Sequence, residues 1–540
     1  MLQVKSAQKR QTAIPLKRRN PVDGTLVIIL IMLLLAGLLV LFSATFYTGT
    51  STRSPYSEVL KQLLGIGLGT AACIVTSRIP YRCWQHPYVV VGGLALSAVL
   101  LVLLFALMLL WGYLGGQTGF FYQNSDWGYR NAIYRDLITN SWPVYYPQKD
   151  TALVYYIGHW LVPAALTKPV YALFGLDAAW MFARMALWGW TALGTYLAAL
   201  NLLVYLRADT GKKQGIGLLF LIFFSGMDIL GALYSSRLPD LLAYDAMHLE
   251  WWTNDFQFSS LTTCLFWVFN QTVGAWLATV CFLQEKDCRN YLLLGTACLM
   301  CGPFPFVGLV IFMVVRGIVL LAQRQKGVLQ SAFSPANVLV LVVVLSITAS
   351  YFLANNAFGY SVLGETVAGN QAAQQTFGQN VLTSLQKGML VFYLLDAGIY
   401  LLLLWRQNRR SWLFYTCAVS LFIIPFFKVG QGCDFCMRVS IPAIFILMTL
   451  CARYFIALVG TKWRDGTLAQ HAVTILLAAT LLIGACTPAM EIYRGICHIA
   501  KEGTFCLENE EPYTLADRPV SLNFETQNCE NKLFFTYFAK

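Results

Sequence analysis

Charged residues are scarce in this sequence. Asp, Glu, Lys and Arg make up 12% of the 540 residues, whereas 57% of the residues are hydrophobic. Charged residues supply about a quarter of an ordinary soluble domain, so this composition excludes that class of protein. Apolar runs of roughly 20 residues recur from Thr25 to Met490, and each can cross the hydrocarbon core of a membrane as a helix. We therefore predict a multi-pass membrane protein.

The sequence also lacks a small-residue cleavage site after its first apolar segment, residues 25–47. This segment is too long for a signal peptide, although basic residues precede it, so we expect a retained signal-anchor. The net charge of +12 does not predict a nucleic-acid partner, because Lys and Arg lie in short loops as the positive-inside rule requires.

Placing the basic clusters in the cytoplasm gives one consistent path through the membrane, with about 12 to 13 spans in an all-α bundle. The expected spans lie near 25–47, 59–77, 88–113, 177–205, 214–236, 261–283, 291–322 (a tight pair broken at 303–305), 337–355, 388–405, 411–428, 440–458 and 470–488. Residues 155–174 do not fit as a crossing, and we expect a helix along the outer surface there. This path places the N-terminus in the cytoplasm. It places the tail, from about residue 491, and the loops 114–152, 237–260, 356–387 and 429–439 outside the cell membrane.

The outer loop 114–152 is the first candidate site. It alternates aromatic, acidic, Arg and Asn residues, and it contains Asp126, Trp127, Arg130 and Asp136. Long ordered loops of this kind tend to be functional. Aromatic rings stack on sugar rings, carboxylates accept hydroxyl protons, and Arg neutralises phosphate, so the pattern is typical of a sugar site. A solvated loop is the simpler explanation for any single one of its carboxylates.

Asp228 and Asp396 are acidic residues inside predicted spans. Burying a carboxylate in a membrane costs several kcal/mol unless it is paired or faces water, so such residues are functional candidates. We favour function over a structural pair for Asp228, and a structural role for Asp396, because no polar residues surround it in the sequence.

Two further groups lie in outer loops. Glu250 and Trp251, next to His248, could bind a metal or a sugar, but an amphipathic surface helix explains them equally well. Arg438 could bind a carrier phosphate, or it could pair structurally with Asp434 at i,i+4. In the same loop Cys433 and Cys436 form a C-x-x-C pair, for which a disulfide or a redox-sensitive pair stays open.

The order of these parts resembles the GT-C superfamily of membrane glycosyltransferases. In that superfamily a first outer loop carries an essential acid, surface helices follow, and a span opens with an Ala-Arg pair. Asp126 matches the acid, residues 155–174 match the surface helices, and Ala183-Arg184 matches the pair. The resemblance implies a GT-C-like fold in which Asp126 is the base or the metal-organising acid, and Arg184 or Arg438 offsets phosphate charge. The outer loops lack an Asp-x-Asp pair, so the part of a divalent metal as cofactor stays open.

Two further resemblances cover different parts of the chain. Beyond residue 114 it is similar to uncharacterised bacterial membrane proteins with the strings "FSGMDILG", "HLEWW" and "CDFCMRVSIPAIFIL". Residues 20–104 resemble instead the first spans of the SEDS polymerases, which build peptidoglycan in division, elongation and sporulation, through "LKQLLGIGLGTAACIVTSRIPYRCWQ". We therefore expect a basic cytoplasmic segment (1–19), a SEDS-like hairpin with the start of a third span (20–104), a GT-C-like body (105–490) and an exoplasmic tail (491–540).

The resulting hypothesis is a glycosyltransferase at the outer face of the bacterial cytoplasmic membrane. It would move a sugar from a polyprenyl-phosphate donor to a cell-envelope acceptor, within the lipid of the membrane and without a nucleic-acid partner. One alternative is a SEDS-like cell-wall polymerase or a protein of division or cell shape, with wall-synthesis proteins as partners. The other is a transporter or flippase for a lipid-linked sugar.

Overall fold

The computed structural model of the chain divides into two compact units, residues 1–97 and 98–540. The structure describes residues 88–243, 247–355, 377–429, 433–461, 466–502 and 513–539. The basic N-terminal segment and the predicted spans 25–47 and 59–77 lie outside the described residues, as does most of the SEDS-like segment. Apart from the first residues of helix α3, the elements named below belong to the second unit.

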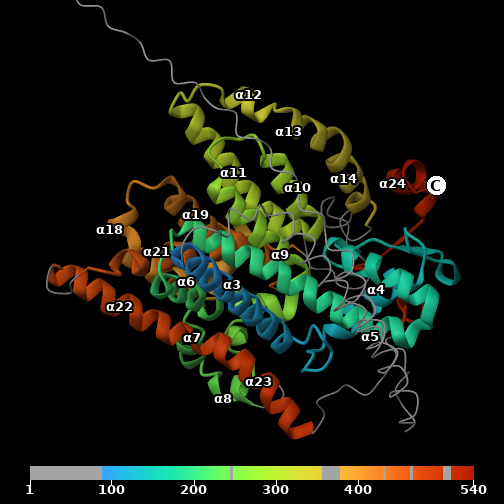
Figure 1. The fold of residues 1–540 in the computed structure, drawn as a ribbon, viewed down its shortest axis with the longest axis horizontal. Coiled ribbons are helices and arrows are strands. Elements are labelled where there is room, and N and C mark those ends of the chain that lie inside the picture. The colour runs from blue at the N-terminus through green and yellow to red at the C-terminus, as the bar shows by residue number, and fades with distance from the viewer. Residues whose placement is uncertain are drawn as a thin grey trace, which may run out of the picture. The chain divides into compact units, whose positions relative to one another are not determined.

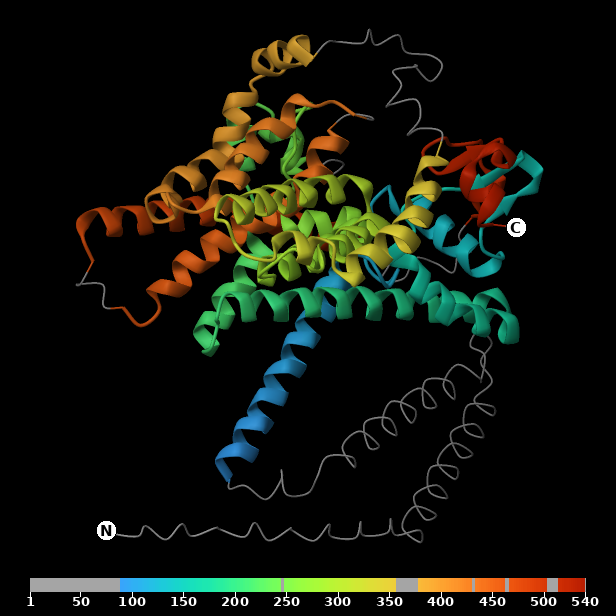
Figure 2. The ribbon, with the colours of Figure 1, turned by 90° about the horizontal axis from the view of Figure 1, so that it is seen from above.

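The described part of the second unit is almost entirely helical (Figures 1 and 2). Its longer helices are α3 (Tyr88–Leu114), α4 (Trp127–Thr139), α5 (Gly158–Tyr205), α6 (Gly211–Phe223), α9 (Leu261–Gln284), α10 (Tyr291–Cys301), α11 (Pro303–Ala322), α16 (Phe377–Gln386), α18 (Ile399–Asn408), α19 (Trp412–Ile423), α21 (Ile441–Leu458), α22 (Leu468–Gly484) and α23 (Cys486–Glu502). Its shorter helices are α7 (Asp228–Tyr234), α8 (Leu238–Leu242), α12 (Val328–Ala332), α13 (Pro335–Leu339), α14 (Ser346–Leu353), α17 (Met389–Tyr393), α20 (Asp434–Val439) and α24 (Leu533–Tyr537). Two π-helical turns, η4 (Val340–Leu345) and η5 (Leu394–Gly398), join α13 to α14 and α17 to α18.

Eight helical segments of the described residues are long and apolar enough to cross a membrane. The prediction of an all-α multi-pass membrane protein is therefore confirmed. Helix α9 is the most deeply buried of these segments and packs against α5, α10 and α21. Its Trp276 stacks on Trp111 of α3 with ring centres 5.7 Å apart, and also lies 6.2 Å from Phe445 of α21. Large aromatic side chains thus fill the space between three helices and form the centre of the core.

Helix α5 is broken at Gly175, where φ is 78°. Only glycine adopts this backbone conformation without steric cost. The break falls between the surface helix that we predicted over 155–174 and the predicted span over 177–205.

The C-terminal residues 513–539 fold onto the loop 114–152. Strands β1 (Tyr145–Tyr146), β2 (Thr151–Leu153) and β3 (Glu525–Gln527) form an antiparallel sheet in the order β1-β2-β3. Thr151 lies opposite Gln527 in the register. The buried Glu525 carboxylate accepts hydrogen bonds from Lys149 Nζ at 2.9 Å and Thr151 Oγ1 at 2.6 Å. The tail therefore covers the loop that carries the first candidate site.

Candidate functional site

Asp126 lies at the N-terminal end of α4, where a local turn positions it. Its backbone N–H donates to Asn124 Oδ1 at 3.1 Å, and the Asn124 amide donates to the carbonyl of Phe266 in α9 at 3.2 Å. One helical turn later, Arg130 Nη2 donates to Asp126 Oδ2 at 2.8 Å. The Arg130 side chain is 8% exposed, whereas that of Asp126 is 48% exposed. The carboxylate is thus held at a fixed place but stays accessible.

A second pair of the same kind starts helix α20. Arg438 Nη2 lies 3.1 Å from Asp434 Oδ1, with side-chain exposures of 14% and 41%. Arg438 Nη1 also donates to the hydroxyl of Tyr156 at 3.0 Å. Again a nearly buried guanidinium is attached to a half-exposed carboxylate.

The two pairs lie close enough to influence each other. Burial lowers the pKa of Arg130, nearby Asp126 raises it, and the positive charge of Arg438 lowers it. Burial also acts to lower the pKa of Arg438, but Tyr156 and Asp434 together leave that pKa above its ordinary value. Asp126 contributes to this increase as well. The fold therefore brings residues about 300 positions apart in the sequence to one site, which we call the paired-arginine site: Asp126, Arg130, Tyr155, Tyr156, Asp434 and Arg438.

Each arginine of this site has a buried nitrogen without a partner. Arg130 Nη1 and Arg438 Nε find no hydrogen-bond acceptor among the described residues. Leaving a buried charged donor unsatisfied costs about 1–3 kcal/mol or more. Guanidinium groups are well suited to bind carboxylate or phosphate oxygens through such donors. The geometry therefore fits an anionic ligand.

Aromatic rings of α4 and α9 pack against Arg130. Trp127 stacks on Phe269 of α9 with centroids 4.9 Å apart, and Arg130 Cζ lies 5.8 Å from the Phe269 ring centre. Phe269 follows a break in α9 at Val268. Breaks inside membrane helices require side chains that accept or donate in place of the lost backbone bonds. Gln117 provides one such bond, because its amide donates to the Leu265 carbonyl at 3.2 Å.

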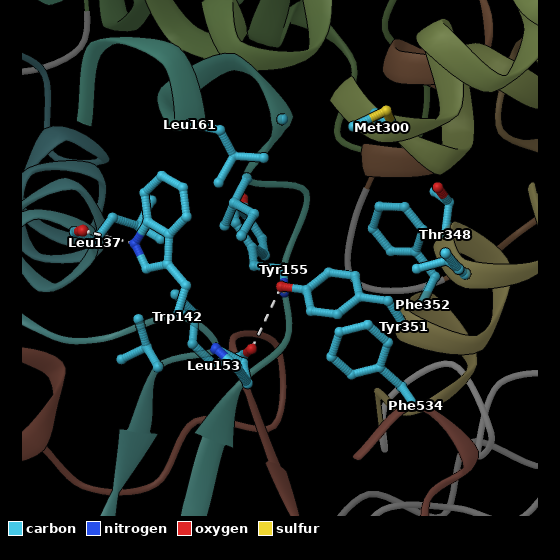
Figure 3. A pocket seen from close by; sticks show the side chains of 15 residues that line it. Leu137, Trp142, Leu153, Tyr155, Leu161, Met300, Thr348, Tyr351, Phe352 and Phe534 are labelled. Atoms are coloured by element: carbon cyan, nitrogen blue, oxygen red, sulfur yellow. Dashed lines mark hydrogen bonds between the residues drawn. The ribbon is translucent and has the colours of Figure 1, made fainter. Parts of the chain in front are cut away.

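An apolar pocket of about 300 Å³ lies next to the paired-arginine site (Figure 3). Tyr155 belongs to both. It lines the pocket, and it is one of the groups that raise the pKa of Arg438. The Tyr155 backbone N–H donates to the hydroxyl of Tyr351 at 3.1 Å, and this hydroxyl donates to the Leu153 carbonyl. The structure thus places an apolar cavity beside the two arginine–carboxylate pairs.

Two other predicted residues, Asp136 of the loop 114–152 and Arg184 of α5, lie elsewhere. Asp136 is fully buried and accepts hydrogen bonds from the Tyr146 hydroxyl at 2.9 Å and the Leu515 backbone N–H at 3.0 Å. It therefore fixes the tail to α4. Arg184 is buried, with Cζ 5.6 Å from the Trp180 ring centre and 6.0 Å from that of Phe120. Neither residue is part of the paired-arginine site.

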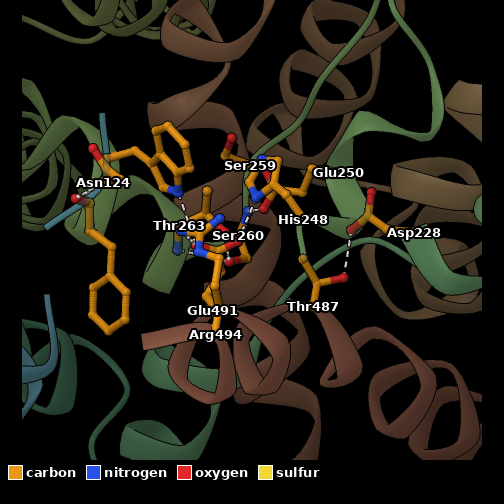
Figure 4. A network of polar contacts seen from close by, with 12 residues as sticks. Asn124, Asp228, His248, Glu250, Ser259, Ser260, Thr263, Thr487, Glu491 and Arg494 are labelled. Carbon is orange, nitrogen blue, oxygen red and sulfur yellow. Dashed lines mark hydrogen bonds and ion pairs between the residues drawn. The ribbon is translucent and has the colours of Figure 1, made fainter. Parts of the chain in front are cut away.

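Asp228 and Glu250 belong to a different cluster in the interior (Figure 4). Asp228 accepts hydrogen bonds from Ser225 and Thr487, and Glu250 accepts bonds from the Gln257 amide at 2.7 Å and the Ser260 N–H at 2.8 Å.

His248 connects this cluster to α23. Its Nδ1 contacts the buried carboxylate of Glu491, which also pairs with Arg494 at 2.6 Å. Trp251 is 40% exposed and presents its ring edge to His248 at 4.5 Å. Among the described residues, no group of three or more His, Cys, Asp or Glu side chains could hold a metal ion.

Cys433 and Cys436 are free thiols in the structure. Cys433 donates from its sulfur to Gln257 Oε1 at 3.2 Å, and burial raises the pKa of Cys436 to about 12. The prediction of a disulfide or redox-sensitive pair therefore gains no support from this geometry.

Sequence reasoning missed Tyr155 and Tyr156 as members of the paired-arginine site. It also missed Asn124 and Phe269, which support the site. Asn124 carried a local signal, because an Asn two residues before an acidic helix start commonly accepts the backbone N–H at that position. No local pattern distinguishes Tyr156 or Phe269 from other apolar-face aromatic residues.

Comparisons with family models, curated proteins and solved structures found no match for this chain. The fold itself defines an all-helical, multi-pass membrane protein.

Proposed function

We propose that the chain is a membrane glycosyltransferase of the GT-C type. It transfers a sugar from a polyprenyl-phosphate donor to a hydroxyl group of a cell-envelope acceptor at the outer face of the cytoplasmic membrane. One observation carries the proposal: the half-exposed carboxylate of Asp126 lies beside two nearly buried arginines whose Arg130 Nη1 and Arg438 Nε have no partner among the described residues.

Asp126 acts as the general base in this proposal. It takes the proton of the acceptor hydroxyl, whose oxygen forms a bond to the anomeric carbon of the sugar. The bond between that carbon and the phosphate oxygen breaks, and its electron pair stays on the phosphate. In this proposal the hydroxyl attacks from the side opposite the carrier phosphate, so the product has inverted anomeric configuration.

Arg130 and Arg438 bind the phosphate that leaves. Their unpartnered nitrogens supply hydrogen bonds to its oxygens, and their charges stabilise the negative charge that develops there. The partner carboxylates Asp126 and Asp434 hold both guanidinium groups in place before the donor binds. The neighbouring apolar pocket supports the choice of a lipid-linked donor, because it offers an apolar surface directly beside the phosphate site.

The test replaces Asp126 by Asn in the full chain. The variant is expressed in a strain of the bacterial host that lacks the gene. The surface glycans of this strain and of one that expresses the wild type are compared by mass spectrometry at equal protein levels. We expect the glycan made by the wild type to disappear, because a general base contributes about 10²–10⁴-fold to the rate. The matched control is Asp240→Asn, an exposed acid of helix α8, which leaves the product unchanged. A normal glycan in the Asp126→Asn strain contradicts the proposal.

The phosphate role has its own test. Arg438→Lys keeps the charge but removes the planar set of donors, so transfer from the lipid-linked donor becomes weaker. The control is Arg237→Lys, whose Nη1 donates to exposed Asn254 at 2.9 Å, far along the chain from both pairs. Equal transfer by the two variants would exclude Arg438 from phosphate binding.

A further inference from the structure

A helix break lies inside one of the candidate membrane spans. Residues 211–234 form a single apolar segment of 24 residues, but helix α6 ends at Phe223 and α7 begins at Asp228. The four residues between them, 224–227, are not helical. Such a break exposes backbone carbonyls, which is tolerated in a membrane only where other groups satisfy them. One of them, the Ser225 carbonyl, accepts a hydrogen bond from the Tyr400 hydroxyl at 2.8 Å.

A π-helical turn lies directly opposite this break. The Met227 backbone N–H donates to the Leu395 carbonyl of η5 at 3.3 Å. The next residue, Asp396, points at the broken segment, because its Oδ1 lies 2.7 Å from the place that a Cβ on Gly226 would occupy. Turns of this kind in membrane helices are frequent at functional sites. Two irregular segments from different helices therefore meet around one carboxylate.

Asp396 is buried, and its carboxylate has no partner within the part of the chain that the structure describes. Its side chain belongs to a residue that is 1% exposed, and neither carboxylate oxygen accepts a hydrogen bond from a described residue. The buried Asp228 is its acidic neighbour, but that carboxylate already accepts bonds from Ser225 at 3.1 Å and Thr487 at 2.8 Å (Figure 4). Glu250, the next acid, is also satisfied by two donors.

The other titratable groups around Asp396 and Asp228 do not neutralise the charge of these two carboxylates. Tyr400 of α18 and Cys436 of α20 are buried and uncharged, and His248 already contacts Glu491. Among the described residues, no lysine or arginine forms an ion pair with Asp228 or Asp396. Two acidic groups without a counter-charge in an apolar interior require a cation to offset their charge.

We propose that Asp396, Asp228 and the broken segment 224–227 form a binding site within the membrane for a small monovalent cation, a sodium ion or a proton. Half-helix ends and unwound carbonyls bind these ions in membrane proteins. A divalent metal fits less well, because no three acidic, His or Cys side chains of the described residues meet as ligands. The site uses different residues from the paired-arginine site, so it adds an ion-coupled function to the chain and does not depend on the transferase.

The experiment uses the purified full chain in lipid nanodiscs. Thermal unfolding is followed by tryptophan fluorescence in NaCl and in choline chloride of equal ionic strength, at acidic and at alkaline pH. For sodium we expect a saturating rise of Tm with NaCl that choline does not produce. For a proton we expect a higher Tm at acidic than at alkaline pH in choline alone. In Asp396→Asn the sodium response should be lost and the pH response should be smaller than in the wild type, whereas the control Asp209→Asn, an exposed acid at the end of a span, should keep both.

A measurement on the wild type covers the case in which Asp396→Asn does not fold. A hydrophobic carbodiimide modifies carboxyl groups in membranes, and mass spectrometry then locates the adduct. We expect the adduct on Asp396 or Asp228, with protection by sodium or by alkaline pH according to the ion. A Tm that responds to neither ion, or an equal response in Asp396→Asn, overturns the proposal. So does a carbodiimide adduct that is absent from both residues or that neither condition suppresses.

Discussion

Gly308 lets helix α11 approach helix α20, which carries Asp434 and Arg438 of the paired-arginine site. A Cβ placed on Gly308 would lie 2.1 Å from the backbone carbonyl oxygen of Val439, the residue after Arg438. Atoms at this separation overlap, and the obstacle is backbone, which cannot rotate away as a side chain can. The replacement Gly308→Ala must therefore move α20 away from α11.

We expect Gly308→Ala to lower the free energy of unfolding. Overpacking of a dense interior costs about 1–3 kcal/mol. Alanine gains about 1 kcal/mol over glycine in a helix interior, so the net loss is about 0–2 kcal/mol. Gly317 of the same helix provides the control, because nothing lies within 4 Å of its Cβ position. Gly317→Ala should only gain stability. The free energies of unfolding of the two variants should therefore differ by the whole overpacking cost, about 1–3 kcal/mol.

The assay is equilibrium unfolding of the full chain in mixed micelles, followed by tryptophan fluorescence. A displaced α20 also moves Arg438, so Gly308→Ala should weaken transfer from the lipid-linked donor, whereas Gly317→Ala should not. Equal stability together with equal transfer in the two variants would refute the close approach of α11 and α20. Equal stability with impaired transfer in Gly308→Ala alone would instead place the effect in the site.

Three other changes test the buried polar groups. Glu491→Gln removes the counter-charge of buried Arg494, so the free energy of unfolding in mixed micelles should fall by about 3–5 kcal/mol. Glu525→Gln weakens the buried contact with Lys149 at 2.9 Å, and the tail should become several times more sensitive to limited proteolysis. Burial raises the pKa of Asp136, so the folded state binds its proton more tightly than the unfolded state. The wild type should gain stability as the pH falls towards about 4, the ordinary pKa of an Asp, and this gain should be smaller in Asp136→Asn in a Tm series.

Exposed acids provide the controls for the first two changes. Asp209 pairs with Lys213 at 2.7 Å, as short a contact as that of Glu491, but its side chain is 70% exposed. Asp209→Asn should therefore leave the unfolding unchanged, and a loss equal to that of Glu491→Gln would contradict the role of burial. Glu530→Gln, in the exposed part of the tail, should not alter proteolysis. A Tm series of Asp136→Asn that parallels the wild type would assign the pH dependence to other groups.

Much of the helical architecture could be predicted, because membrane spans have a strong signal. The break at Gly175 of α5 and the break at Gly302 between α10 and α11 both occur where loop charges or proline predicted them. The break between α6 and α7 gave no such signal, because the apolar run "FLIFFSGMDIL" has the hydropathy of one continuous helix. Its Ser225-Gly226 pair matters only because Asp396 approaches from another helix.

The structure of the C-terminal tail could also be predicted only in part from the sequence. The sequence indicated an outer segment from about residue 491, but α23 continues to Glu502, and its Glu491 and Arg494 are buried against α9. Strand β3 has three residues, too few for a periodic pattern to predict it. Its place depends on the partner strand β2, about 370 residues earlier in the chain.

The paired-arginine site explains why sequence reasoning found its members but not the site. Asp126 with Arg130 and Asp434 with Arg438 each stand four residues apart at the start of a helix, a spacing that predicts only a local ion pair of a few tenths of a kcal/mol. If either pair existed alone, the structural explanation would suffice. The structure places the two beside each other, so that each arginine acts on the surroundings of the other while a donor on each stays unused. Each arginine already has a carboxylate partner, so the buried donor that stays unused on each guanidinium is the feature that fits a ligand oxygen, and it is visible only once the chain has folded.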